Sequence, residues 1–462
     1  MKENAPMDRQ AKNNETQATW GWLNFLFVLC LFLPVLVLLM MPGGTMMGAF
    51  LWLPIVLLLC FWMIASMAAA ARGEQQEETD HTVDDGIRMI PDGEQPDAIR
   101  AVMDVRVAMQ QNGGGIFRGR LTSPADEALT RLQSAFGEST VPMIQQDEEL
   151  GTAIVLMNRP TDESVLERPT RPWLHWLLFG LTFLTTTWAG ALHQGVNLLE
   201  QPSEIAVGLW YSVGLLLILG VHEMGHYFMA RHHGLKVSPP FFIPVPFALG
   251  TFGAFIQMKS PTRNRRALFD VAVAGPLAGL VVAIPALLIG LQTTQVLPPD
   301  AEPAAAMMGH GTSAGSSLLF ALISKIALGD QLQDGYLLQL SPLAFAGWLG
   351  LLVTALNLMP IGQLDGGHMA RAMFGRRVGE TISSVAMWSL FLLAIFVWPG
   401  LLFFALFIYF IAGRGTPPLN DITPISPGRR WIGYAAFVIL ALILIPLPHK
   451  FWHAAEIYCP YL

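Results

Sequence analysis

The sequence predicts a polytopic α-helical membrane protein with about nine transmembrane segments, a re-entrant β-like loop and a small α+β soluble domain. Two observations favour this fold class. Hydrophobic residues make up 53% of the 462 residues and charged residues only 13%, whereas soluble domains carry about a quarter charged residues. The apolar residues also gather in runs long enough to cross a bilayer. The lipid bilayer is therefore an expected partner of this chain.

Charge and cysteine content narrow the other partners. The formal net charge is −7 and no basic tract is present, so nucleic acid is not an expected partner. The three cysteines form no Cys-x-x-Cys pair, so histidines and carboxylates would have to hold any metal ion. Residues 1–19 form a polar tail of mixed charge, typical of neither a cleaved signal nor a transit peptide.

The N-terminal part of the chain is expected to hold a membrane anchor and a soluble domain. Residues 20–71 contain two apolar runs around a Pro-Gly-Gly turn, which predicts a transmembrane hairpin for anchoring or packing. Residues 73–98 are acidic and typical of a solvated linker. Residues 99–170 predict a small α+β domain without a convergent set of His, Cys or Ser, so we expect it to recognise or regulate. Its expected elements are strands at 116–121, 141–144 and 152–157 and a helix at 124–136.

Residues 172–448 are expected to form the membrane core, followed by a C-terminal tail at 449–462. Apolar runs predict spans at 172–192, 205–231, 268–291, 343–359, 381–398 and 431–447. Whether the shorter run within 399–412 also crosses the membrane stays open.

One predicted span carries residues suited to metal chemistry. An apolar run from Ile205 leads directly into His222-Glu223-Met224-Gly225-His226. Positions i and i+4 share one face of a helix, so the two histidines can bind one Zn²⁺ while Glu223 reaches a water on the ion. Such a cluster is costly in hydrocarbon unless it faces a cavity or a metal. The alternative is that these histidines only close a membrane helix at the interface, as we expect of His232 and His233.

Residues 238–258 are apolar but are broken by four prolines and two glycines, which excludes a spanning helix. Irregular backbone at membrane depth must be covered by protein or line an aqueous cavity. We therefore predict a re-entrant loop with short extended strands beside the metal helix. An amphipathic surface loop is the alternative.

A second polar stretch, residues 357–368, follows the span 343–359. A catalytic zinc needs three protein ligands and an open position. Asp365 is the best candidate for the third ligand, because the metal would compensate its charge. His368 is the rival ligand, or a group that supports one. The plain alternative is a turn that ends a helix, with Gly366-Gly367 as its terminator.

Lysines and arginines predict the orientation of the chain. If there are nine spans, the basic clusters fall on one face, while the opposite loops, 193–204 and 293–340, hold few basic residues. The N-terminus and the 73–170 region are therefore expected in the cytoplasm, and a bacterial inner membrane is the expected location. Asp270 is expected to be an interfacial charge near Arg265 and Arg266.

Three motifs together resemble the site-2 protease family of intramembrane zinc metalloproteases: His222-Glu-Met-Gly-His226, Gly275-x-x-x-Gly279, and Asn357-x-x-Pro360 followed by Leu364-Asp365-Gly366. The runs 250–257 and 267–279 are most similar to the cyanobacterial and chloroplast branch. Many bacterial members carry a PDZ domain in the loop after 268–291. Residues 293–340 are too short and too low in complexity for one, so the resemblance is to members without a PDZ domain.

The resemblance implies a zinc metalloendopeptidase that cleaves transmembrane segments of other membrane proteins, as in regulated intramembrane proteolysis. One Zn²⁺ per chain would be held by His222, His226 and Asp365, with Glu223 as the general base. By family analogy Asn357 would hydrogen-bond the substrate backbone or the oxyanion; capping a broken helix is its alternative role.

A transmembrane substrate must unwind before attack, because a helix hides its carbonyl groups. The 238–258 loop could hold the unwound peptide by strand addition, which makes Phe252, Gly253 and Ala254 candidate substrate-binding residues. Two other function classes compete: a membrane transporter and a non-catalytic scaffold that binds client proteins. Two features argue against a transporter. The chain shows no internal repeat, and a pair of histidines with a general base is superfluous for transport.

Overall fold

A computed structural model describes residues 88–158, 172–297, 317–396 and 417–445 of the chain, apart from short gaps at 112–113, 138–139, 148, 247–248 and 332–336, and a few residues between 402 and 409. Contacts divide the chain into two units, Met1–Gly86 and Ile87–Leu462, and every described residue belongs to the second. The predicted hairpin at 20–71 and the tails at 1–19 and 449–462 lie outside the described residues, as does most of the linker at 73–98 and of the run within 399–412.

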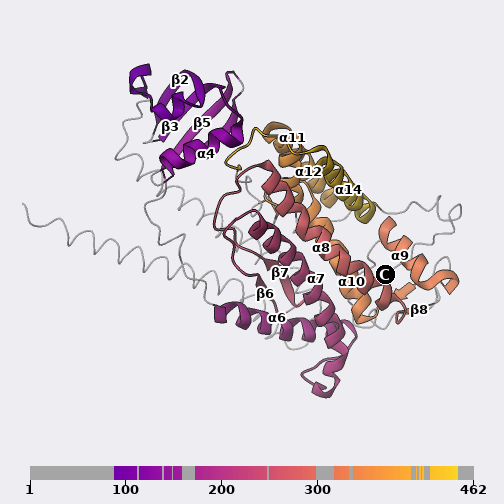
Figure 1. Cartoon of the computed structure of the whole chain (residues 1–462). Coiled ribbons are helices and arrows are strands. Elements are labelled where there is room, and N and C mark those ends of the chain that lie inside the picture. Colours follow the sequence, from indigo (N-terminus) through magenta and orange to yellow (C-terminus); the bar gives the residue numbers. More distant parts are fainter. Residues whose placement is uncertain are drawn as a thin grey trace, which may run out of the picture. The chain divides into compact units, whose positions relative to one another are not determined.

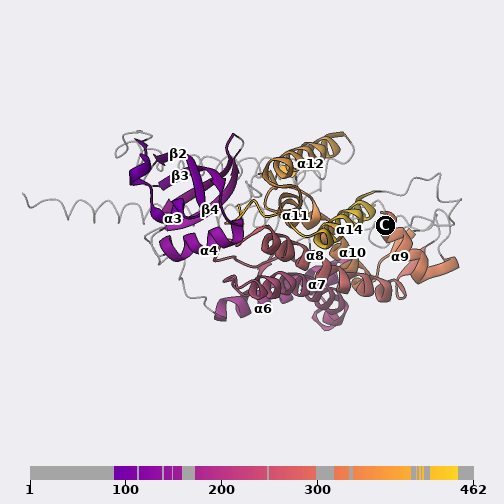
Figure 2. The same cartoon turned by 45° about the horizontal axis from the view of Figure 1, so that its top comes forward.

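Residues 88–158, which we call the soluble region after its prediction, form a five-stranded antiparallel sheet in the order β1-β2-β3-β5-β4, with helix α4 against it (Figures 1 and 2). The strands are β1 (Arg88–Met89), β2 (Met103–Gln111), β3 (Gly114–Leu121), β4 (Thr140–Asp147) and β5 (Gly151–Asn158). The helices are η1 (Asp92–Glu94), α3 (Asp97–Arg100) and α4 (Ala125–Phe136). The core forms where Leu129 and Leu132 of α4 meet Phe117, Ile144 and Ile154 of the sheet.

Three strands and the helix of this region lie where the sequence predicted them, but two strands were missed. β2 alternates apolar and polar residues, a period of two that indicates a strand. β1 and α3 lie in the predicted solvated linker, and β1 pairs with β2. The solvated linker predicted at 73–98 therefore extends too far, because β1 within it completes the edge of the sheet.

The rest of the described chain is mostly helical (Figure 1). Its α-helices are α6 (Pro172–His193), α7 (Ile205–His232), α8 (Arg265–Leu291), α9 (Leu318–Leu328), α10 (Pro342–Leu358), α11 (Asp365–Phe374), α12 (Arg376–Phe396) and α14 (Pro427–Leu444). Short 3-10 turns, η2 (Pro202–Glu204) and η4 (Gly329–Gln331), and a strand pair, β8 (Gln295–Leu297) with β9 (Leu337–Gln339), complete it.

Among the described residues, four helices are long and apolar enough to cross a membrane: η2 with α7 (Pro202–His232), α8, α12 and α14. The apolar helices α9 and α10 are shorter, and α6 is not one of the four. The structure therefore supports a helical membrane protein, while the count of about nine spans stays a prediction.

Small residues let α7 and α8 approach closely at the metal motif. A Cβ atom added to Gly225 of α7 would lie 2.6 Å from the carbonyl oxygen of Ala274 in α8. In the other direction, a Cβ on Gly275 would lie 2.1 Å from His226 Nε2, and one on Gly279 would lie 3.2 Å from His222 Nδ1. The small residues of Gly275-x-x-x-Gly279 therefore permit a close helix approach, and it occurs against the two histidines.

The proline-broken stretch after α7 forms an antiparallel pair, β6 (Phe241–Pro244) and β7 (Thr251–Phe255), as predicted. Neighbouring helices satisfy the backbone of its turn: Thr185 of α6 donates to the Gly250 carbonyl at 2.7 Å, and Tyr211 of α7 donates to Leu249 at 2.9 Å. Gly250 has φ of 80°, and a Cβ there would lie 2.5 Å from the Thr186 backbone. Backbone at membrane depth requires such partners, although the depth itself stays a prediction.

Candidate metal centre

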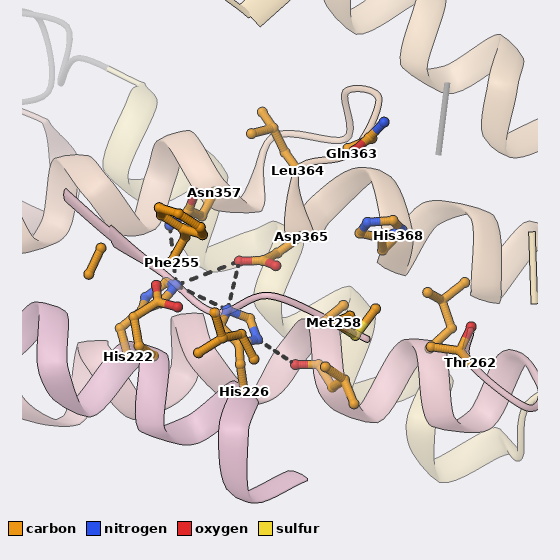
Figure 3. Close-up of a pocket in the computed structure, with 16 residues that line it drawn as sticks. His222, His226, Phe255, Met258, Thr262, Asn357, Gln363, Leu364, Asp365 and His368 are labelled. Atoms are coloured by element: carbon orange, nitrogen blue, oxygen red, sulfur yellow. Dashed lines mark hydrogen bonds and ion pairs between the residues drawn. The ribbon is translucent and has the colours of Figure 1, made fainter. Parts of the chain in front are cut away.

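Helix α7 presents His222 and His226 on one face, one turn apart, and both side chains are buried. Their Nε2 atoms lie 3.2 Å apart and point toward the same space (Figure 3). His226 is oriented through its other ring nitrogen: Nδ1 lies 2.7 Å from the Val271 carbonyl oxygen of α8, so it must donate there. Nε2 of His226 then carries a lone pair, as a metal ligand requires.

Asp365 is the first residue of α11 and reaches the same space from the opposite side (Figure 3). Its Oδ2 atom lies 3.2 Å from His226 Nε2 and 3.6 Å from His222 Nε2. The chain turns between the end of α10 and Asp365 through hydrogen bonds from Ile361 to Met359 and from Leu364 to Ile361. The carboxylate of Asp365 thereby comes within reach of His222 and His226, which lie far from it in the sequence.

Gly366 and Gly367 lie inside the first turn of α11, so the interpretation of this pair as a helix terminator is wrong. A Cβ on Gly366 would lie 1.9 Å from the Leu358 carbonyl oxygen, and one on Gly367 would lie 2.4 Å from the Gly362 carbonyl oxygen. The two glycines therefore allow the start of α11 to pack directly against the end of α10.

The three donor atoms fit a single zinc ion. Ligands at about 2.0–2.1 Å from a tetrahedral zinc lie roughly 3.3 Å from one another. The observed separations are 3.2, 3.2 and 3.6 Å, and His222, His226 and Asp365 form the one group of three metal-binding side chains found among the described residues. Two imidazole nitrogens and a carboxylate oxygen at such distances would place lone pairs against each other unless a proton or cation lies between them.

A cavity of about 270 Å³ adjoins these donors. Glu223, which is 7% exposed, lines it together with the three donor residues. One wall comes from β7 and the residues that follow it: Ala254, Phe255, Ile256 and Met258. Of the three loop residues predicted to bind substrate, Phe252, Gly253 and Ala254, only Ala254 lines the cavity. Phe252, which is 56% exposed, and Gly253 are not among the residues that line it.

Two further residues of the predicted site also line the cavity. The Asn357 side-chain nitrogen lies 3.2 Å from His222 Nε2, beside the donor atoms (Figure 3). His368 lies one turn along α11 from Asp365 and does not belong to the group of three donors. Its Nδ1 atom is buried without a hydrogen-bond partner among the described residues, and burial lowers the pKa of its imidazole. The rival assignment of His368 as third ligand is therefore not favoured by the geometry.

Asp270, expected to be an interfacial charge near Arg265 and Arg266, has hydrogen-bond partners on other helices. Its carboxylate accepts hydrogen bonds from Arg429 Nε at 2.7 Å and Arg429 NH2 at 2.8 Å, and lies 2.9 Å from His233 Nε2. His233 is therefore part of a network that joins α7, α8 and α14. Arg265, one of the two expected partners, pairs instead with Asp421. α14 begins more than 150 residues after Asp270, a separation over which no sequence pattern indicated contact.

Fold and site define a class: a helical membrane protein with a donor set of two buried histidines and one half-buried carboxylate. Residues 210–397 match the family model described as Peptidase family M50. This match confirms the resemblance that the motifs predicted.

Curated relatives agree with this family. The chain is 31% identical over 351 residues to the rice (Oryza sativa subsp. indica) "Probable zinc metalloprotease EGY2, chloroplastic", covering 73% of this chain and 62% of the rice protein. From Arabidopsis thaliana, EGY1 is 33% identical over 257 residues (54% of this chain, 45% of that protein) and EGY3 is 31% identical over 371 residues (72% and 61%). The chain thus spans less than two thirds of the length of these relatives, whose names place them in the chloroplast, as the predicted branch implied.

Proposed function

We propose that this chain is a zinc metalloendopeptidase that cleaves transmembrane segments of other membrane proteins. One observation carries the proposal: His222, His226 and Asp365 converge within the geometry of a single zinc ion, and Glu223 lines the same buried cavity. One Zn²⁺ per chain is the expected content. The names of the relatives, which are zinc metalloproteases, support this chemistry.

The residues of the chain have separate roles in this proposal. Zn²⁺, when bound, supplies a Lewis acid and lowers the pKa of a water molecule to about 7. Glu223 accepts the proton of the attacking water and passes it to the leaving amine. Asn357 projects its amide beside His222, where it can donate to the charge that develops on the substrate carbonyl oxygen. Val271 and the small residues of α8 keep the His226 ring in its orientation.

The unwound substrate would bind along β7. This strand pairs with β6 along one edge only, in a two-stranded sheet, and Ala254 and Phe255 line the cavity. A peptide that adds to the other edge would run past Glu223 with its carbonyl groups exposed. Phe252 and Phe255 are 56% and 48% exposed, and can pack against apolar substrate side chains.

For the location of the chain we propose a bacterial inner membrane, with the N-terminus and the soluble region on the cytoplasmic side. The distribution of lysine and arginine supports this orientation: Arg263, Arg265 and Arg266 precede or begin α8, and Arg429 and Arg430 begin α14. Protease added outside spheroplasts should then leave residues 88–158 intact, and their rapid digestion would contradict the orientation.

The decisive experiment compares the purified full chain with Glu223→Gln, measuring bound zinc and cleavage of a single-span substrate in liposomes. We expect about one zinc per chain in both proteins and cleavage only in the wild type. A transporter or a client-binding scaffold would behave the same with either residue. Loss of zinc together with unchanged handling of the substrate would refute the peptidase.

A further inference from the structure

A short segment before α14, residues 419–422, contacts both the soluble sheet and the metal-site helices; we call it the latch segment. Its residues are Leu419, Asn420, Asp421 and Ile422. Leu419 and Asp421 are buried, with exposed fractions of 7% and 1%, and Asn420 is fully buried. The latch segment lies outside the part of the chain that matches the family model.

On one side the latch segment completes the soluble region. It lies parallel to β4, where the Ile144 N–H donates to the Leu419 carbonyl at 2.7 Å and the Asp421 N–H donates to the Ile144 carbonyl at 2.9 Å. Leu419 belongs to the hydrophobic core of the soluble region, and Ile422 packs against that core. Figures 1 and 2 show this segment, in yellow, beside the soluble strands and α4.

On the other side Asp421 lies between two arginines of the helical core. Arg265 Nε donates to Asp421 Oδ1 at 2.9 Å, and Arg371 NH2 lies 3.6 Å from Oδ2. Each arginine residue is 7% exposed. Arg265 begins α8, the helix that holds His226 through Val271, and Arg371 lies in α11, the helix that begins with Asp365.

The contacts of Asp421 differ in burial from the other polar contacts that join the soluble region to the helical core. Arg263 with Thr130 and Arg376 with Gln145 are exposed pairs, which contribute little rigidity. Asp421, in contrast, is a buried carboxylate that compensates two buried cations. Loss of its charge would remove an ion pair with Arg265 and one with Arg371, and would weaken the link from the latch segment to α8 and α11.

We propose that Asp421 is a positioning residue for the metal site, and that the soluble region holds α11, and with it Asp365, through the latch segment. The soluble region thereby becomes a determinant of the distance between the carboxylate and the two histidines. The effect of Asp421 on cleavage rests on the proposed function, whereas its effect on the position of α11 does not.

The test is hydrogen exchange of peptides from α11, measured by mass spectrometry on the zinc-free full chain in detergent. Asp421→Asn should raise the exchange rate of residues 366–374 by roughly tenfold or more, because α11 loses a buried ion pair. Glu127→Gln is the matched control, since this carboxylate pairs with Arg131 on the exposed surface of α4 and should leave α11 unchanged. Equal exchange in Asp421→Asn and the wild type would overturn the proposal.

A second variant tests the soluble side. Leu419→Ser removes an apolar contact with the soluble core and leaves Asp421 in place, yet it should also raise exchange in α11. Unchanged exchange there would overturn the coupling to the soluble region. If Asp421→Asn were too unstable to purify, Leu419→Ser would decide the matter by itself, because it leaves the charge of Asp421 in place.

Cleavage separates a positioning role from a general structural one. Asp421→Asn should lower kcat and the half-time of zinc loss to a chelator, with little change in KM, and Asp421→Glu should recover part of both. A rise in KM alone would contradict the proposal. Cleavage retained in Glu223→Gln would refute the proposed general base but would leave the α11 exchange result standing.

Discussion

The two halves of the donor set are built in different ways. His222 and His226 lie one turn apart on α7, so any helix through this sequence places them on one face. Asp365 reaches them only because α10 ends, the chain turns, and α11 packs against the end of α10 through Gly366. The helix-borne pair therefore depends on local structure, whereas the carboxylate depends on tertiary packing. Substitutions should affect the two halves differently.

The largest effect should come from the helix-borne pair. His226→Ala removes a donor that no neighbouring side chain replaces, so bound zinc should fall from about one per chain to near zero and cleavage should be lost. Metal analysis after gel filtration measures the bound zinc, and an assay in liposomes measures cleavage. His232→Ala is the control, because this exposed histidine lies on the same helix away from the donors. Zinc retained in His226→Ala would disprove the assigned ligand.

Removing the carboxylate should have the next largest effect. Asp365→Asn keeps the shape of the side chain but replaces an anionic ligand with a neutral one. We expect zinc affinity to fall by more than the roughly 10–100-fold that loss of a supporting group costs. Competition with a zinc indicator measures the zinc affinity. Asp97→Asn, which changes an exposed carboxylate in α3, is the control. If His368 were the third ligand, His368→Ala would show this loss and Asp365→Asn would not.

A smaller effect is expected where α8 supports the histidines. A Cβ on Gly275 would lie 2.1 Å from His226 Nε2, so Gly275→Ala must displace the ring and should weaken zinc binding by roughly 10–100-fold. Gly180→Ala in α6, where a Cβ meets nothing within 4 Å, should leave the affinity unchanged. Equal affinities in the two variants would show that the helix-borne pair does not depend on α8.

The smallest effect should appear on β7. Phe252→Ala removes an exposed ring from the proposed substrate strand and should raise KM by about two- to fivefold, with kcat and zinc content unchanged. Steady-state cleavage of a reconstituted single-span substrate distinguishes the two constants. Phe228→Ala, which removes an exposed ring from α7 outside the cavity, should change neither. A loss of zinc in Phe252→Ala would place this residue in the metal site instead.

Sequence reasoning succeeded where spacing alone determines geometry. The histidine pair and the strands around the prolines follow from local periodicity and from backbone limits. It failed where partners lie far apart in the chain: the latch segment, the Asp270 network with Arg429, and the role of Gly366. β2 is an exception, because its alternation was visible in the sequence and was missed.

The sequence by itself determined that apolar helices would carry a histidine pair with an adjacent glutamate, and that a carboxylate would follow a later helix. Helical periodicity and the cost of burying charge in apolar surroundings suffice for that much. Only the tertiary structure decided that Asp365 meets these histidines, that small residues of α8 hold their rings, and that Asp421 ties α11 to the soluble sheet. Such contacts depend on packing between distant segments, which no local pattern encodes.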